Sequence, residues 1–93
     1  MPLKIHAYTA VNNSTGAYVA LAASVKNRRI YIQPLADIRL ADNDSGTNYI
    51  RLAGGALARY DLGVTDPSTL YAVANSSSTA TNVSVYSIDP GES

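Results

Sequence analysis

The chain contains no cysteine among its 93 residues. Disulfide bonds therefore cannot brace it, and a zinc site built from cysteines is excluded as well. A chain of this length buries only about 60–65% of the surface that it exposes when unfolded, so its hydrophobic core should be modest. We therefore expect a single small domain that lies outside the disulfide-rich secreted class.

Charge is scarce too. Charged residues make up 15% of the chain, and the formal net charge is zero. Binding to nucleic acid needs an excess of basic residues, so nucleic acid is not an expected partner. A hydrophobic content of 46% argues against disorder. Because small soluble monomers usually carry net charge, a surface rich in Ser, Thr, Asn, Tyr and Ala favours a component of an assembly over a lone monomer.

Long apolar runs are missing. The longest weakly polar stretch, residues 17–25, is shorter than the roughly 20 apolar residues that a membrane span needs. Residues 1–6 contain no apolar run that could serve as the central part of a secretory signal. We therefore expect neither a targeting segment nor a membrane partner.

Patterns of catalysis and metal binding are not evident either. His6 is the only histidine, and no G-x-S-x-G motif accompanies it. Residues 42–46 resemble the start of a calcium loop, but the sixth and twelfth positions hold Thr47 and Ala53, where that pattern needs Gly and Glu. We interpret this run as a turn, with a fortuitous calcium site as the alternative. The expectation is a protein that is not an enzyme and has no cofactor or metal.

Alternation of apolar and polar residues is the main positive signal. It is clearest in residues 29–33, 38–40 and 83–88. Successive side chains of a strand point to opposite faces, so alternation predicts strands with one buried face. Nearly every such segment is bounded by Gly, Pro, Asn, Asp or Ser. The pattern predicts an all-β fold, a single small β-sandwich or jelly-roll-like barrel of about eight short antiparallel strands.

Eight segments are expected as strands: residues 3–10, 18–25, 29–33, 38–41, 48–53, 57–62, 70–74 and 82–88. Residues 18–25 are ambiguous, since their alanines also suit a helix. In the first segment, Ile5, Ala7 and Thr9 are expected to share one face. The last two segments are expected to pair as a hairpin.

We divide the chain into three parts. Residues 1–26 should supply N-terminal strands, with a docking arm as a further option, and residues 27–88 should form the main body of the same sandwich. Residues 26–28 are expected to form a hairpin turn between two strands. Residues 89–93, which include Pro and Gly, are expected to form a flexible tail.

Arginine and tyrosine supply the candidate binding residues. Guanidinium groups suit planar contacts to carboxylates, and tyrosine offers a large, stiff contact surface that is apolar with one polar tip. The candidate interface residues are Tyr8, Tyr18, Arg28, Arg29, Arg39, Tyr49, Arg51, Arg59 and Tyr60. For the arginines, solvated surface charge and the binding of anions or sugar acids are the alternatives. Tyr71 and Tyr86 are expected to pack on the sheet instead.

One long stretch carries a resemblance. It combines N-R-R-I-Y-I-Q-P-L at residues 27–35 with L-Y-A-V-A at 70–74 and T-A-T-N-V-S-V-Y at 79–86. Over about residues 27–88 the chain resembles small β-rich phage virion proteins, which serve as capsid decoration (cement) proteins or as small tail and fibre modules. The likeness is one of strands and turns. It implies no enzymatic activity and transfers no site residues.

The resulting expectation is a non-enzymatic structural protein of a bacteriophage virion. It would lie on the capsid surface, bind the major capsid protein as a homotrimer, and stabilise the shell by bridging coat subunits. Many contacts on one particle add up through avidity, and symmetric closure limits the size of the oligomer. The alternative is a carbohydrate- or receptor-binding tail or fibre module. In that case the loops at residues 12–16, 42–48 and 75–81 should gather at one end.

Overall fold

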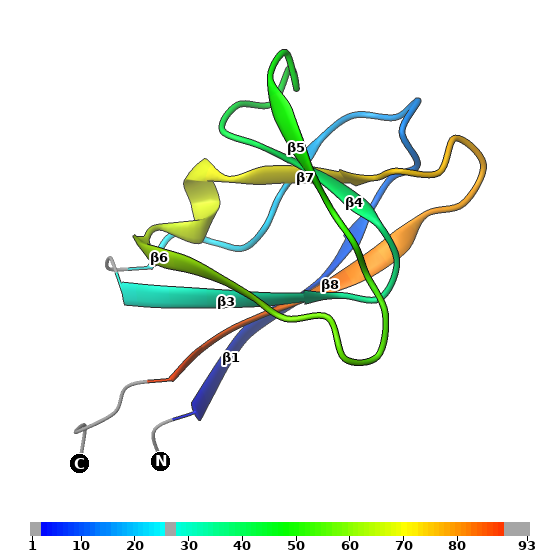
Figure 1. Ribbon diagram of the computed structural model, residues 1–93. Helices are drawn as coiled ribbons and strands as arrows, with labels where there is room; N and C mark the ends of the chain where they lie inside the picture. The colour runs from blue at the N-terminus through cyan, green and yellow to red at the C-terminus, as the bar shows by residue number, and fades with distance from the viewer. Residues whose placement is uncertain (1–2, 26–27, 89–93) are drawn as a thin grey trace.

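The computed structural model describes residues 3–25 and 28–88, which form two four-stranded antiparallel sheets facing each other (Figure 1). The first sheet has the order β1-β8-β3-β6 and consists of Leu3–Val11 (β1), Thr81–Ile88 (β8), Arg28–Pro34 (β3) and Tyr60–Thr65 (β6). The second has the order β2-β7-β4-β5 and consists of Val19–Ala20 (β2), Tyr71–Ala74 (β7), Ile38–Ala41 (β4) and Tyr49–Leu52 (β5). The predicted all-β, sandwich-like fold is confirmed, and the sheets do not close into a barrel.

The core lies between the two sheets and is built by the alternation seen in the sequence. Ile30 and Ile32 of β3 point inward, whereas the residues on either side of each are more exposed. The same pattern places Val83 and Val85 of β8 in the core. The buried cluster comprises Val11, Leu21, Ile30, Ile32, Ile38, Leu40, Ala72, Val83 and Val85. Full burial of one such aliphatic side chain contributes about 1.5–3 kcal/mol.

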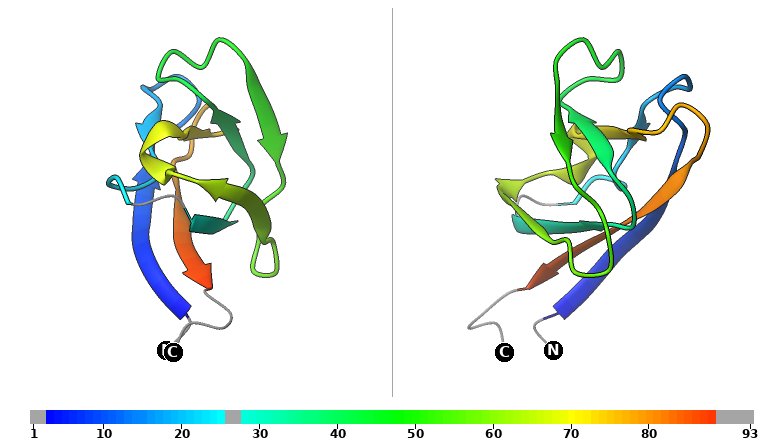
Figure 2. Two further views of the ribbon diagram at one scale, coloured as in Figure 1. Left: turned by 90° about the vertical axis from the view of Figure 1, so that its left-hand side faces the viewer. Right: turned by 45° about the vertical axis from the view of Figure 1, so that its right-hand side comes forward.

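The predicted hairpin between residues 70–74 and 82–88 is wrong. β7 is an inner strand of the second sheet, paired with β2 and β4, while β8 is an inner strand of the first sheet, paired with β1 and β3. Each strand therefore has both of its edges occupied by other partners. The loop between them crosses from one sheet to the other, as the orange segment in Figure 2 shows.

The hairpin expected around residues 26–28 does not form either. Residues 26–27 lie outside the described residues, as does the tail expected at 89–93. The strands on either side, β2 and β3, belong to different sheets, so they cannot pair with each other. The expected long strand at residues 18–25 is reduced to the two residues of β2. The Leu21 N–H donates to the Leu70 carbonyl at 2.9 Å in line with the register of β2 and β7, and beyond Leu21 the chain leaves the sheet.

Residues 42–48 connect β4 and β5, which do form a hairpin between consecutive strands. The side-chain oxygen of Asn43 accepts hydrogen bonds from the Gly46 N–H (2.9 Å) and from the Ser45 hydroxyl (2.7 Å). Gly46 has a φ of 64°, which favours glycine. The run 42–46 is thus the turn that the sequence predicts. The strand expected at residues 57–62 begins later, at Tyr60, because Ala58 belongs to the preceding turn through its bond to the Gly55 carbonyl.

A β-bulge interrupts β1, and because of it Ile5 lies on the other face of the strand from the predicted one. The register with β8 shifts between Ile5 and Ala7, so that Ile5 lies opposite Tyr86 and Ala7 lies opposite Val85. The additional residue, His6, is hydrogen-bonded through its Nε2 atom to the Ser87 hydroxyl at 2.8 Å. Ile5 therefore points outward, while Ala7 packs against the core. The prediction that Ile5 shares a face with Ala7 and Thr9 is wrong because simple alternation assumes an unbroken ladder.

The Asp66 side chain links the residues after β2 to the connection between β6 and β7 through hydrogen bonds. Its carboxylate accepts hydrogen bonds from the Ser24 hydroxyl (2.6 Å) and the Ser68 N–H (3.0 Å). Asp66 is also the N-cap of the short 3-10 helix Pro67–Thr69 (η1), where the sequence predicts a turn. Because these donors favour the charged carboxylate, the bond from Ser24 most of all, they lower the pKa of Asp66 to about 2.

Acidification is expected to remove the contribution of Asp66 to stability. A carboxyl group whose pKa is lower in the folded state stabilises the fold above its unfolded pKa, near 4, and loses this effect as the pH falls toward 2. In urea unfolding, Asp66→Asn should be less stable than wild type at about pH 6, and the difference should shrink by about pH 2. Asp44→Asn, at an exposed turn position, is the matched control. A gap that stays constant with pH would contradict this role.

Candidate functional site

Apolar and aromatic side chains gather on the outer face of the first sheet. Cross-strand register places Ile5 opposite Tyr86 and Tyr86 opposite Tyr31, so these three side chains lie in one row across β1, β8 and β3. We call this surface the tyrosine face, and it consists of Leu3, Ile5, Tyr8, Tyr31, Val64 and Tyr86. It lies on the side of the first sheet away from the core.

The tyrosine face has a rigid centre and an exposed apolar rim. The rings of Tyr31 and Tyr86 stack with their centroids 5.5 Å apart and their planes 16° from parallel. Tyr86 is only 8% exposed, whereas Ile5, Tyr8 and Val64 are 61%, 60% and 64% exposed. Stacked aromatic rings lose little freedom when another surface covers them. Exposed apolar side chains grouped on one face of a sheet are typical of a protein–protein contact.

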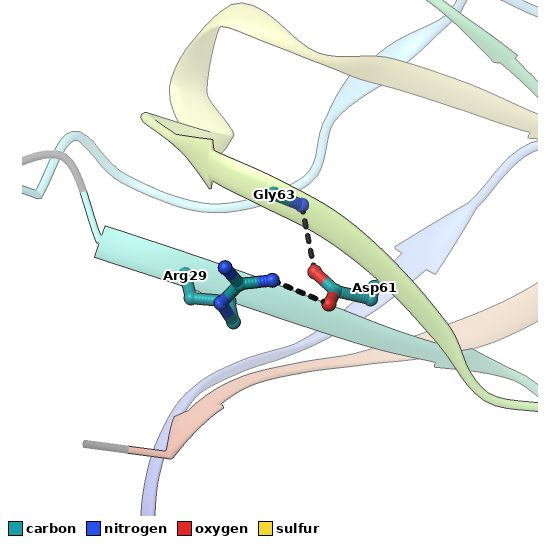
Figure 3. Close-up of polar contacts among 3 residues, drawn as sticks. All are labelled: Arg29, Asp61 and Gly63. Atoms are coloured by element: carbon teal, nitrogen blue, oxygen red, sulfur yellow. Dashed lines mark hydrogen bonds and ion pairs between the residues drawn. The ribbon is translucent and has the colours of Figure 1, made fainter. Parts of the chain in front are cut away.

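An ion pair borders the tyrosine face beside β6. The Arg29 Nη1 atom donates to Asp61 Oδ2 at 2.7 Å, and the Gly63 N–H donates to Asp61 Oδ1 at 2.8 Å (Figure 3). The bond from Gly63, followed by that from Arg29, holds the pKa of Asp61 below its usual value. Asp61 in turn raises the pKa of Arg29. Both side chains are about half exposed, so the pair orients Arg29 more than it stabilises the fold.

The outer face of the second sheet holds a separate group of predicted site residues. Arg39 lies directly opposite Arg51 in the pairing of β4 with β5. The Arg39 Cζ atom lies 4.8 Å from the centre of the Tyr49 ring, and its Nε atom donates to Asn75 Oδ1 at 3.0 Å. Like charges that face each other across strands are unfavourable. The contacts with Tyr49 and Asn75 help to hold Arg39 in place despite this repulsion.

The remaining predicted site residues lie elsewhere. Tyr18 packs against Gly46, where a Cβ atom would overlap its ring. Arg28 begins β3, Arg59 is exposed in the loop before β6, and the Tyr60 hydroxyl donates to the Ala53 carbonyl. Tyr8 and Arg29 lie on or beside the tyrosine face, while Arg39, Tyr49 and Arg51 lie on the opposite outer face. The nine predicted residues therefore do not form one surface.

Sequence reasoning missed the aliphatic part of the tyrosine face. Alternation predicts that Ile5 shares a face with Ala7 and Thr9, and it indicates no role for Leu3 or Val64. Their types carry no surface signal, because the same residues build the core. Leu57 was also missed: it is 96% exposed in the loop between β5 and β6, within a segment expected to be a strand.

The described part of the chain meets neither the requirements of a metal-ion cluster nor those of a membrane-spanning helix. Among residues 3–25 and 28–88, no group of three or more His, Cys, Asp or Glu side chains is placed to hold a metal ion. The same residues include no helix with the length and hydrophobicity of a membrane span. Comparisons of the chain with protein-family models, curated proteins and solved structures found no match. The surfaces of the chain itself are therefore the basis for proposing a function.

Proposed function

We propose that this protein is a non-enzymatic structural protein of a phage virion that binds the capsid surface through the tyrosine face. The supporting observation is that face itself, with exposed aliphatic side chains around the stacked rings of Tyr31 and Tyr86. A specific interface buries about 800 Å² on each partner. That is roughly one seventh of the 5319 Å² that the chain exposes, so one outer face can supply it.

Bridging two coat subunits requires two contact regions on one molecule. The tyrosine face supplies the first, and the outer face of the second sheet, with Arg39, Tyr49 and Arg51, supplies the other. The two faces lie on opposite sides of the sandwich (Figure 2). Arginine and tyrosine are enriched at protein interfaces, and guanidinium groups pair well with carboxylates. A modest affinity at each contact suffices, because many copies on one shell act together.

Loss of two exposed side chains from the tyrosine face is expected to weaken binding to phage heads. The double variant Ile5→Ser/Tyr8→Ser should bind at least about tenfold more weakly, since apolar and tyrosine anchors at an interface each contribute about 1 kcal/mol or more. Co-sedimentation of the purified chain with heads from its source measures this. Leu35→Ser is the matched control, because Leu35 is a similarly exposed aliphatic residue outside the tyrosine face. Equal binding by wild type and the double variant would overturn the proposal.

One arrangement of loops favours a second candidate function, a carbohydrate- or receptor-binding tail or fibre module. The Ser14 N–H donates to the Ser76 carbonyl at 2.9 Å and joins the loops at residues 12–16 and 75–81 (Figure 1). Tyr18 packs on Gly46 and so links the turn at 42–48 to the same end. Amide and hydroxyl groups of this kind form hydrogen bonds with sugars. Specific binding on a glycan array, unaffected by Ile5→Ser/Tyr8→Ser, would favour this function over the first.

A further inference from the structure

An apolar pocket opens beside β5, at the edge of the second sheet. It has a volume of about 300 Å³ and is lined by Leu40, Ile50, Leu70 and their neighbours, with Asp42 and Asn48 among the polar residues. Ile50 lies opposite the core residue Leu40 in the strand register, so both point to the inner side of the sheet. Ile50 is nevertheless 58% exposed, because the first sheet does not cover β5. The pocket is thus an exposed continuation of the core.

Whereas the pocket is concave, Leu57 is an apolar side chain that projects into solvent. It is 96% exposed at the tip of the loop between β5 and β6. This loop is braced, since the Gly55 N–H donates to the Pro34 carbonyl at 3.0 Å and the Gln33 side chain donates to the Ala56 carbonyl at 2.9 Å. A braced loop loses little conformational freedom on binding. Leu57 is therefore a preorganised contact residue of the same apolar character as the pocket.

The charges beside the two features are complementary. Arg59 lines the same shallow hollow as Leu57, so both residues face one side of the loop. Within residues 3–25 and 28–88, neither Arg59 nor Asp42 forms an ion pair. Arg59 follows Leu57 by two residues in the same loop, and Asp42 lines the pocket, so opposite charges lie beside the two complementary apolar features.

We propose that copies of this chain associate head to tail, with Leu57 of one copy in the pocket of Leu40, Ile50 and Leu70 on the next, and Arg59 paired with Asp42. The loop between β5 and β6 and the turn between β4 and β5 lie at opposite ends of β5 (Figure 1), so one copy cannot make this contact with itself. Such a contact is heterologous and generates a ring where the rotation closes. The inference deepens the proposed function by naming the contact that joins neighbouring copies, but it can be tested without any shell.

Sedimentation of the purified full-length chain over a range of concentrations tests this contact. Wild type should associate, and Leu57→Ser should weaken the association at least about tenfold, because the burial of one leucine is lost. Leu57 is almost fully exposed, so this variant should fold, and circular dichroism checks that it does. Leu35→Ser is the matched control and should associate like wild type. A wild type that stays monomeric, or an oligomer unaffected by Leu57→Ser, would overturn the proposal.

Charge reversal tests the proposed pair of Arg59 and Asp42 separately from the contact of Leu57. Arg59→Asp and Asp42→Arg should each weaken association, because each places like charges together across the contact. The double variant Arg59→Asp/Asp42→Arg restores opposite charges and should recover most of the affinity. A double variant no better than the single variants would contradict the pairing. Ile5→Ser/Tyr8→Ser should associate normally while losing binding to phage heads, so the two proposals can fail independently.

Discussion

Replacing Ile32 by alanine is expected to lower the free energy of unfolding by about 2–5 kcal/mol. Ile32 has no solvent exposure and lies on β3, an inner strand of the first sheet. It faces the core between Val85 of β8 and Tyr60 of β6, both directly opposite it in the register. Neighbours held by strand pairing on both sides cannot move in to fill the space that the lost carbon atoms leave. The cost therefore includes a cavity as well as lost burial.

This loss would be a large part of the total stability, which is about 5–15 kcal/mol for a domain of ordinary size. Urea denaturation followed by circular dichroism measures it as a lower midpoint with an unchanged slope. Ile5→Ala is the matched control, since the same atoms are removed at a position that is 61% exposed. It should cost less than about 1 kcal/mol. Equal losses at the two positions would contradict the placement of Ile32 in the core.

The fold class could be predicted from the sequence because both of its signals are local. Alternation depends on the two-residue period of a strand, and turns depend on residue types that tolerate tight backbone geometry. The strand at residues 38–41 has the predicted bounds, and the turn at 42–46 forms as expected. Where the local signal was weak, at residues 18–25, the strand shrank to Val19–Ala20. There the Leu21 N–H still donates to the Leu70 carbonyl in line with the register of β2 and β7, and the bond from Ser24 to Asp66 then holds the following residues outside the sheet.

The pairing of strands could not be predicted in the same way. Alternation predicts which residues of a strand face inward. It does not predict which two strands pair, so the predicted hairpins join strands that are neighbours in the sequence. In the structure, β8 pairs with β1, nearly the whole length of the chain away. The bulge at His6 is equally hidden, because one unpaired residue changes the face of Ile5 without changing the local pattern. Both features depend on contacts between distant segments.

The candidate site, too, was predictable from the sequence only where residue type decides, and not where contacts between distant segments decide. Residue type indicated that tyrosine and arginine suit interfaces, and Tyr8 and Arg29 do lie on or beside the tyrosine face. Sequence could not show that Arg39 lies on the opposite side of the molecule, because that depends on which sheet β4 joins. It also gave no reason to separate exposed Leu57 from buried leucines such as Leu21. Exposure of an aliphatic residue is a property of the assembled sandwich.

Replacing Gly54 by alanine is expected to cost about 3 kcal/mol of stability, at the upper end of the range for overpacking. A Cβ atom at this position would overlap the backbone of Ala36, including its carbonyl group. No side chain can rotate away to relieve the overlap, so the backbone itself must move. Two hydrogen bonds would strain in that movement, from the Gly54 N–H to Asp37 Oδ1 and from the Gly55 N–H to the Pro34 carbonyl, each 3.0 Å long. The loop that presents Leu57 would therefore loosen as well.

Gly63→Ala is the matched control for this prediction. Gly63 has a φ of 76°, and a Cβ atom there would meet nothing within 4 Å, so alanine should cost only the backbone strain of about 1–2 kcal/mol. Urea denaturation of both variants compares steric overlap with strain. The double variant Gly54→Ala/Ala36→Gly should remain as unstable as Gly54→Ala, because the atoms in the way belong to the backbone of residue 36 and not to its methyl group. Recovery in that double variant would show that the loop between β5 and β6 does not lie against the backbone after β3.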